Sequence, residues 1–461
     1  MSKLRRRLLG LTFNYLPIFE PNPAASGVVY AAMGGGKTTS VAIPAVQSLF
    51  ADKQCAICIN DVKDGEIAHQ IAEMCIKHDR KFAVVDDLHV MGKDYPYRIE
   101  LNAFSQAQTV AQTAPEQLPF IIEGISNALI EEPPNDQRNF YWRESPRELT
   151  EYAYKVLLKH NARLATPGGL QSFMADSHSW NSALELEADD PDSELSSGAR
   201  DILDMRSLNP EHYVQHMRAA LNALKVFSFG SLRDAGRSPD ITHEELLRDN
   251  WVVCFVAPVR YAERLGPYYA QHFLSLLKAQ LTGATGRACL ILDEFCNAPL
   301  KEAVNKITVF RAYGLKCLYI TQSRQDVVRK YGERETAILE ENCAVKQWLR
   351  FSDFDEAERV SKAIGDGTNV SHGLGLNSDR FAYSGNFSTG KDRLFTPFEL
   401  MNLPEDEQII HVSGVGFIHA RKIRQNEIAP YCFDLAPNPL EGGRLPPDPK
   451  VTLAVPKGTD Q

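Results

Sequence analysis

The chain has 461 residues with 50 Lys and Arg against 59 Asp and Glu, a formal net charge of −9 and an isoelectric point near 5.8. This acidic balance argues against a protein that coats nucleic acid through a basic surface, although it leaves room for a local basic groove. The length predicts roughly two to three domains and a core large enough to need neither disulfides nor metals for stability.

Residues 1–24 are expected to form a basic arm. Three arginines at 5–7 precede an apolar run over 8–19, which Asn14 and Pro17 interrupt. The run is shorter than the roughly 18 apolar residues that a membrane span needs, and no small-residue cleavage site follows it. Two interpretations are open: the arm packs on the body of the protein, or it docks on a membrane surface or a partner.

The cysteines are odd in number, which indicates free thiols in a reducing cytoplasm. Cys55 and Cys58 form a CxxC motif, yet the surrounding segment has the pattern of a buried strand. Alternation along a strand directs these two thiols to opposite faces, and no second Cys or His pair lies at zinc-like spacing. We therefore expect neither a metal site nor a redox role there.

Short apolar strands alternate with helical patterns in two parts of the chain, as is typical of a parallel α/β sheet. The expected strands are 27–32, 56–61, 81–86, 251–257, 288–293, 316–322 and 344–350. A later hairpin with a Ser-Gly turn is predicted from 407–412 and 416–423. The two groups of strands predict one discontinuous α/β domain, made of 25–104 and 250–435.

Between these parts, residues 105–249 show no convincing strand and predict an inserted all-α domain. Its helical patterns cover 120–129, 147–160 and 211–227. Within it, 175–200 is rich in Asp, Glu and Ser and is expected to be an exposed or mobile loop. The tail over 436–461 is rich in proline and is expected to be extended and flexible.

The strongest local motif is Ala31-Ala-Met-Gly-Gly-Gly-Lys-Thr38, which follows an expected strand and opens an expected helix. It matches a phosphate-binding P-loop with Ala31 in place of the usual first glycine. The run of glycines lets backbone N–H groups approach phosphate oxygens, and the helix N-terminus favours an anion. Lys37 is expected to reach the β- and γ-phosphates, and Thr38 to ligate Mg²⁺. The expected nucleotide-binding residues are Gly34, Gly35, Gly36, Lys37, Thr38 and Thr39.

An apolar strand over 290–292 ends in two carboxylates, Asp293 and Glu294. After a P-loop, this pair is typical of an NTPase that hydrolyses its nucleotide: Asp293 holds the Mg²⁺ shell through water, and Glu294 polarises the attacking water as general base. Gln322 ends the next strand, where a polar side chain beside the γ-phosphate can report hydrolysis; a glutamine in a plain turn is the alternative. The all-α insertion separates the P-loop from the acidic pair and is expected to carry the substrate-specific work.

From residue 25 to 435 the chain resembles, in order, the coupling-protein ATPases of type IV secretion and conjugation, the TraG/TraD group. The matching segments lie at 37–44, 61–66, 97–102, 140–142, 293–295, 311–314, 320–323, 331–332, 342–343, 393–399 and 403–404. Ala103 departs from the family pattern, which has a proline there. The resemblance implies a RecA-like P-loop NTPase domain with an inserted all-α domain. It also implies ATP and Mg²⁺ as cofactors and a motor-type ATPase assembled as a homohexameric ring.

The resemblance further implies an active site between subunits, which a neighbour's arginine completes. Arg311 is the candidate, because it follows the acidic pair at the place of the family's arginine; an intrasubunit salt bridge is its alternative role. Lys63 and Glu66 are candidates to shape the same interface. Family members carry transmembrane helices before the P-loop, whereas this sequence shows none. Two explanations are open. The sequence is truncated, or the protein is cytoplasmic and a membrane-anchored partner recruits it to the periphery of the inner membrane.

Three functions stay open from the sequence. The first is a coupling protein or translocase that delivers DNA, as a relaxase–DNA complex, to a type IV secretion or conjugation channel. For this role Arg233 and Arg237 are candidate contacts to the DNA backbone, or else two solvated loop arginines. The second is an ATPase receptor for protein effectors of such a system, and the third is a nucleotide-gated assembly scaffold. The acidic pair disfavours the scaffold, since slow turnover needs no general base.

Overall fold

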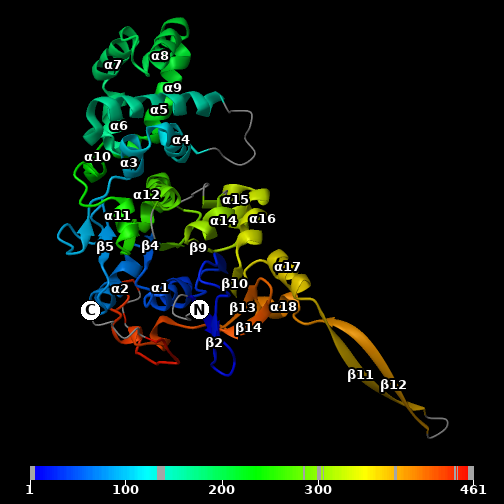
Figure 1. The fold of residues 1–461 in the computed structure, drawn as a ribbon. Coiled ribbons are helices and arrows are strands. Elements are labelled where there is room, and N and C mark those ends of the chain that lie inside the picture. The colour runs from blue at the N-terminus through cyan, green and yellow to red at the C-terminus, as the bar shows by residue number, and fades with distance from the viewer. Residues whose placement is uncertain are drawn as a thin grey trace.

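The computed structural model describes residues 6–131, 141–283, 286–297, 303–304, 306–377, 382–440, 443 and 445–454, and for 367–391 the backbone alone. Figure 1 shows an α/β body with a helical domain on one side and a long β-hairpin that projects away from the body. Among the residues that the structure describes, none of the helices combines the length and the hydropathy that a membrane span requires.

A mixed sheet of twelve strands forms the centre of the body, in the order β2-β1-β14-β13-β10-β3-β9-β8-β4-β7-β5-β6. These strands are β1 (Leu8–Leu11), β2 (Pro17–Phe19), β3 (Gly27–Ala31), β4 (Cys55–Asp61), β5 (Phe82–Val85), β6 (Arg98–Ile99), β7 (Val252–Val256), β8 (Arg287–Leu292), β9 (Leu315–Thr321), β10 (Val345–Arg350), β13 (Glu407–Val412) and β14 (Gly416–Arg421). The strands from β10 to β6 run parallel, and the other four form an antiparallel edge. The predicted α/β class is confirmed, and each predicted strand is present with small shifts at its ends.

Helices cover both faces of the parallel part of the sheet. They are α1 (Ile43–Leu49), α2 (Glu66–Lys77), α12 (Ala262–Thr282), α14 (Ile307–Phe310), α15 (Arg324–Tyr331), α16 (Glu333–Asn342), α17 (Phe354–Ile364) and α18 (Pro397–Met401). The buried residues of α1 and α2 pack in one apolar core and those of α12 in another. Because the parallel strands are buried on both faces, their sequences are nearly continuous apolar runs, which made them recognisable.

The two cysteines of the CxxC motif lie on β4, which is buried along its whole length. Cys55 belongs to the core on the α1 and α2 side, and Cys58 belongs to the core on the α12 side. The predicted orientation of these thiols to opposite faces is therefore confirmed. All nine cysteines of the chain are free thiols, and eight of them are buried.

The N-terminal arm packs on the body, as the first interpretation predicted. β1 pairs with β14, and β2 folds back on β1. The buried carboxylate of Glu20 accepts hydrogen bonds from Arg7 N at 2.8 Å and from Lys316 Nζ at 2.5 Å. Arg7 also donates to Gln347 Oε1 at 3.0 Å. Arg7 is thus a buried anchor of the arm and not a membrane contact, while residues 1–5 lie outside the described part.

Helices fill the insertion between β6 and β7, as predicted. They are α3 (Ser105–Thr113), α4 (Leu118–Leu129), α5 (Tyr141–Asn161), α6 (Pro167–Ala175), α7 (Ser177–Asp189), α8 (Ser196–Leu208), α9 (Pro210–Ala223), α10 (Ser231–Asp234) and α11 (His243–Arg248). Buried Trp180 of α7 donates to the hydroxyl of Tyr213 on α9 at 2.8 Å, which ties the outer helices together. The helical domain joins the body where α3 and α4 pack on α12.

The acidic segment 175–200, which was predicted to be an exposed or mobile loop, is largely helical. It contains α7 and the start of α8, and Asp176 caps α7 by accepting a hydrogen bond from His178 N. Glu187 is buried and accepts from Lys159 Nζ at 2.8 Å. Two of the acidic residues thus occupy a helix cap and a buried ion pair, and acidic composition did not reveal that the segment is helical.

A hairpin that the sequence did not predict is formed by β11 (Asp366–Asn377) and β12 (Ala382–Arg393). The two strands pair antiparallel along their whole length. The hairpin follows α17 and extends away from the body (Figure 1). Its sequence is rich in Gly, Ser and Asn, so it lacks the alternation of apolar and polar residues that marks a strand.

The C-terminal segment, which was predicted to be flexible from residue 436, packs on the body over its described part. β15 (Ile428–Ala429) pairs in parallel with β16 (Val451–Thr452). Ala436 N donates to Gln70 O at 3.0 Å, on α2. The prolines keep this segment extended, but backbone hydrogen bonds and buried side chains fix it to the surface of the body. Residues 455–461 of the tail lie outside the described part.

Candidate functional site

Four neighbouring strands of the sheet end at one edge, and each is followed by a residue that the sequence had singled out. β3 leads into the P-loop, β9 into Gln322, β8 into Asp293 and β4 into Lys63. These strands are parallel and lie in the order β3-β9-β8-β4, so their carboxyl ends meet at the same edge. Crevices outside the carboxyl ends of parallel strands are the usual ligand sites of α/β sheets.

The loop after β3 has the backbone shape of a P-loop. Gly34 and Gly36 have φ values of 73° and 84°, in the left-handed region that favours glycine. A Cβ on Gly35 would lie 2.9 Å from a backbone carbonyl oxygen, so this position also requires glycine. Ala31 ends β3 in an extended conformation, which explains why alanine can replace the usual first glycine. The chain then passes through a wide helical turn over Thr38–Ala42 into α1.

Lys37 and Glu294 form an ion pair, with Lys37 Nζ 2.5 Å from Glu294 Oε1. Glu294 has a φ of 48°, a left-handed conformation that costs a non-glycine residue on the order of 1–3 kcal/mol. Gln322 Nε2 lies 3.5 Å from Glu294 Oε2. The structure thus brings the P-loop lysine, the acid proposed as general base and the glutamine of the next strand into contact.

Asp293 is buried next to this pair, with 1% of its side chain exposed. Its Oδ1 has no hydrogen-bond partner in the described part of the chain, and its Oδ2 lies 3.6 Å from Lys63 Nζ. Burial raises the pKa of Asp293, and the ammonium of Lys63 opposes this rise. Lys63 Nζ also lies 3.5 Å from Thr38 Oγ1 and 4.0 Å from Glu294 Oε1. A second ammonium therefore compensates the acidic pair, a role that the sequence left unassigned.

The donors at this edge fit a hard divalent cation such as Mg²⁺. Thr38 Oγ1 and the unpartnered Oδ1 of Asp293 are oxygen ligands of the kind that Mg²⁺ takes in P-loop sites, where phosphate and water fill the other positions. Neither a thiolate nor an imidazole is among these donors, which disfavours softer metals. The orphaned oxygen of a buried carboxylate is the structural observation that supports a cation here.

Glu66 lies beside the P-loop because it is the first residue of α2. Thr38 Oγ1 donates to Glu66 Oε2 at 3.3 Å. Asp61 fixes the start of α2, since its Oδ2 accepts from Ile67 N at 2.9 Å and from Ala68 N at 2.8 Å. Burial raises the pKa of Asp61 to about 7, although these two hydrogen bonds act in the opposite direction. The end of β4 and the start of α2 thus supply two buried carboxyl groups, Asp61 and Glu66, behind the cation site.

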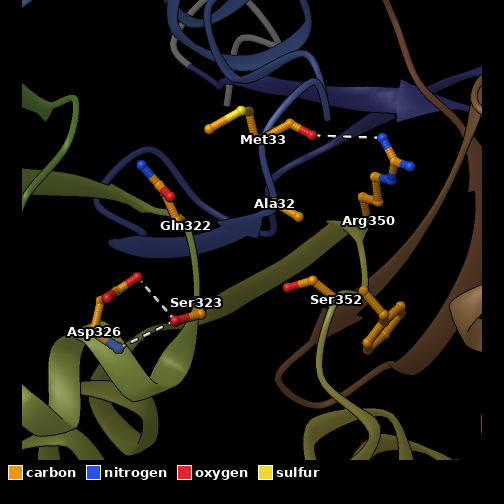
Figure 2. Close-up of a pocket in the computed structure, with 8 residues that line it drawn as sticks. Ala32, Met33, Gln322, Ser323, Asp326, Arg350 and Ser352 are labelled. Carbon is orange, nitrogen blue, oxygen red and sulfur yellow. Dashed lines mark hydrogen bonds between the residues drawn. The ribbon is translucent and has the colours of Figure 1, made fainter.

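A pocket of about 480 Å³ opens beside the P-loop, and Figure 2 shows the side chains around it. Its lining residues are Ala32, Met33, Gln322, Ser323, Asp326, Arg350, Phe351 and Ser352. Arg350 ends β10 and donates to Met33 O at 3.4 Å, while Lys422 Nζ donates to Gly35 O at 3.3 Å. Because a trans peptide directs its N–H opposite to its C=O, the peptide groups that follow Met33 and Gly35 direct their N–H groups away from Arg350 and Lys422. Neither Arg350 nor Lys422 was predictable from the sequence, because a basic residue near a strand end is not a motif.

Arg311 does not belong to this cluster. It lies in a short turn, Arg311–Tyr313, before the amino end of β9, whereas Gln322 follows the carboxyl end of that strand. A strand of this length spans about 23 Å, so Arg311 is far from the P-loop of its own chain. Its side chain is exposed and forms no ion pair with another described residue.

The two candidate DNA contacts lie near α10 in the helical domain. Arg237 forms an ion pair with Asp234, with Nη1 2.9 Å from Oδ1. Arg233 is exposed. Of the two, Arg233 is therefore the more accessible to a phosphate backbone, and the structure does not bring either residue to the P-loop edge.

Both the sequence and the fold are similar to those of known proteins. Residues 10–428 match the model of a family described as Type IV secretory system Conjugative DNA transfer. No curated protein sequence matches the chain. An unbound form of the bacterial conjugative coupling protein TrwBdeltaN70 is similar with a TM-score of 0.65 and 14% identity, over 90% of this chain and 88% of that one.

Two further structures show the same likeness. TrwB in complex with ADP and Mg²⁺ has a TM-score of 0.63 at 14% identity, over 90% of this chain and 88% of that one. VirB4 of Thermoanaerobacter pseudethanolicus has a TM-score of 0.51 at 14% identity, over 92% and 97%. At such identity the likeness shows the fold, a RecA-like P-loop NTPase domain with an inserted all-α domain, and the expected fold class is confirmed. Since the family model covers nearly the whole sequence, the chain belongs to the type IV secretory system conjugative DNA transfer family.

Proposed function

We propose that this protein binds ATP with Mg²⁺, hydrolyses it, and uses the energy to deliver DNA, as a relaxase–DNA complex, to a type IV secretion channel. The observation that carries the proposal is the convergence of Lys37, Thr38, Asp293, Glu294 and Gln322 at one edge of the sheet. TrwB, which shares the fold, is known in complex with ADP and Mg²⁺ and with non-hydrolysable analogues of ATP and GTP. ATP and Mg²⁺ are accordingly the ligands that we assign to this site.

The site holds the groups that phosphoryl transfer to water needs. The P-loop N–H groups and Lys37 bind the β- and γ-phosphate oxygens, so Lys37 leaves Glu294 for the phosphates. The Glu294 carboxylate then accepts a proton from water, whose oxygen bonds to the γ-phosphorus while the bond to the β–γ bridging oxygen breaks. The products are ADP and inorganic phosphate. Thr38 and Asp293 would hold Mg²⁺, which would neutralise charge on the phosphate oxygens.

The proposal includes a homo-oligomer, a hexameric ring with the nucleotide between subunits. Arg311 of one subunit then stabilises the charge on the phosphoryl group that is transferred in the next subunit. Its exposure and its distance from its own P-loop support this role. A ring also confines basic side chains to a channel, which makes DNA transport compatible with a net charge of −9. A membrane-anchored partner would hold the ring at the cytoplasmic face of the inner membrane.

ATPase assays of the full chain, with and without single-stranded and duplex DNA, test this proposal together with the mass of the oligomer. We expect single-stranded DNA to stimulate hydrolysis, and the stimulation to fall as salt rises because phosphate contacts release counterions. Lys37→Ala should abolish basal and stimulated activity. An assembled oligomer that binds no DNA would overturn the DNA-transport part of the proposal.

Delivery of protein effectors is the second candidate function. The helical domain favours it, because Tyr141 and Trp142 of α5 are exposed on its surface, and such side chains are enriched at protein interfaces. This function predicts that secretion signals, and not DNA, bind the protein and stimulate hydrolysis. A nucleotide-gated scaffold is disfavoured, since the contact of Glu294 with Lys37 and Gln322 builds a site equipped for turnover.

A further inference from the structure

The C-terminal segment reaches the P-loop through one side chain. Asn438 is buried, and its Nδ2 donates to Glu66 Oε1 at 2.8 Å. Its Oδ1 accepts from Leu440 N at 2.9 Å, so the backbone fixes which end of the amide faces Glu66. The other oxygen of Glu66 accepts from Thr38 Oγ1. A continuous path of hydrogen bonds therefore joins residue 438 to the P-loop.

Further contacts hold the segment in this place. Ala436 N donates to Gln70 O at 3.0 Å, and Asn438 N donates to Gly443 O at 3.1 Å. Gln70 Nε2 in turn donates to Glu66 O at 3.0 Å. The segment is thus docked on α2 just before Asn438, and a hydrogen bond within the segment fixes the backbone of Asn438 itself.

The direction of these hydrogen bonds matters for a cation at Thr38. A hydroxyl that ligates a metal uses an oxygen lone pair, so its proton must point to another acceptor. An ionised carboxylate accepts only, and Glu66 Oε2 lies within reach of this proton. Acceptors behind a metal ligand fix its orientation and raise its basicity. Because the second oxygen of Glu66 is tied to Asn438, the carboxylate is held against rotation away from Thr38.

We propose that Glu66 and Asn438 are positioning residues of the magnesium site. Glu66 accepts the hydrogen bond of the Thr38 hydroxyl and so leaves a lone pair of the hydroxyl oxygen for the cation. Asn438 holds the Glu66 carboxylate in the orientation that accepts this hydrogen bond. The inference rests on the proposed binding of nucleotide with Mg²⁺. It makes the C-terminal segment a part of the nucleotide site.

The variant Asn438→Asp tests the proposal, because it places a second carboxylate against Glu66 and pushes it from Thr38. We expect the Kd for a fluorescent ATP analogue to rise about tenfold in Mg²⁺ and to change little in EDTA. Asn426→Ala is the matched control, since it removes a 2.9 Å hydrogen bond from an asparagine to Pro446 O of the same segment, away from Thr38. This control should bind the analogue as the unchanged protein does in both buffers.

A double variant separates positioning from mere structure. In Glu66→Gln with Asn438→Asp, the introduced amide N–H donates to the introduced carboxylate, and the amide oxygen accepts from Thr38. We expect this swap to restore the Mg²⁺-dependent affinity to within about threefold of the unchanged protein. Recovery through a reversed hydrogen bond is not expected from a residue that only supports the fold.

Failure of the positioning role and failure of the proposed function give different results. Equal Mg²⁺-dependent affinity in Asn438→Asp and the unchanged protein would overturn the inference and leave the proposed function standing. No binding of the analogue by the unchanged protein in either buffer would overturn the proposed function itself. If thermal melting shows that Asn438→Asp does not fold, Asn438→Ala and the double variant are compared instead. Loss of the Mg²⁺-dependent affinity in Asn438→Ala and its recovery in the double variant would support the proposal. The same Mg²⁺-dependent affinity in these two variants would overturn it.

Discussion

Lys37 Nζ lies 2.5 Å from Glu294 Oε1, so the P-loop lysine and the acid of the next motif neutralise each other at the edge of the sheet. Phosphate oxygens compete for the same ammonium, because Lys37 cannot face both partners at full strength. In the proposed mechanism, arrival of a nucleotide breaks this pair and releases the Glu294 carboxylate. The proposal thus couples activation of the general base to phosphate binding.

Glu294→Gln should lower turnover of ATP by about 10²–10⁴-fold, because the amide cannot accept the proton of the attacking water. Affinity for ATP should stay the same or rise, since Lys37 loses a charged competitor. Steady-state hydrolysis and nucleotide titration measure the two effects. Glu211→Gln, an exposed glutamate of α9, is the matched control. Undiminished turnover in Glu294→Gln would remove Glu294 from the role of general base.

Arg311→Ala should retain nucleotide binding and lose hydrolysis, if its guanidinium acts on the neighbouring subunit. Mixing gives a sharper test, because Arg311→Ala and Lys37→Ala subunits in one ring form some interfaces in which both residues are intact. We expect the mixture to recover part of the activity that each variant lacks alone. A mixture as inactive as its components, with mixed oligomers demonstrated by mass, would assign Arg311 a role within its own subunit.

Glu20→Ala should lower the free energy of unfolding by about 3–5 kcal/mol, because it leaves Lys316 and Arg7 buried without their counter-charge. The comparison is Glu405→Ala. Glu405 is exposed, its pair with Arg424 spans 3.5 Å, and its removal should cost at most about 1 kcal/mol. Urea unfolding of both variants checks the difference. Equal small losses would show that Glu20 does not anchor the N-terminal arm.

Lys422 predicts a pH dependence of stability on the alkaline side. Burial lowers its pKa from 10.5 to about 8. Between these two values the unfolded chain binds more protons than the folded one, so the contribution of Lys422 to stability rises with pH across this window. Lys422→Met lacks this rise, and its melting temperature relative to the unchanged protein should fall between pH 8 and pH 10.5. A difference in melting temperature that is constant with pH would contradict the prediction.

Motifs with fixed spacing made much of the site predictable. The P-loop and the pair Asp293 and Glu294 each follow a buried strand, and the parallel order of these strands brings them together with Gln322. Asn438 was not predictable in the same way. Its contact depends on where the C-terminal segment returns to α2, which is a long-range property of the fold and leaves no local pattern.

Two segments show where composition misleads. The stretch over 175–200 looked like a solvated loop because it is acidic, yet Asp176 acts as a helix cap and Glu187 as a buried ion-pair partner. The hairpin of β11 and β12 was not predicted, because its strands are rich in Gly, Ser and Asn and lack an alternating pattern. In both segments, hydrogen bonding of the backbone decides the structure, and average hydropathy does not report it.

The strand order also fixes the sequence of events during synthesis on the ribosome. The strands made early, β3, β4 and β5, are not neighbours of one another in the sheet. β3 lies between β9 and β10, and β4 lies between β7 and β8, so every ladder partner of these two strands is translated after the helical domain. The contacts within the helical domain are local, so this domain can fold before β3 and β4 pair with their neighbouring strands. The P-loop therefore leaves the exit tunnel before both strands that flank β3, and we expect a nascent chain to bind nucleotide only after β10 has been translated.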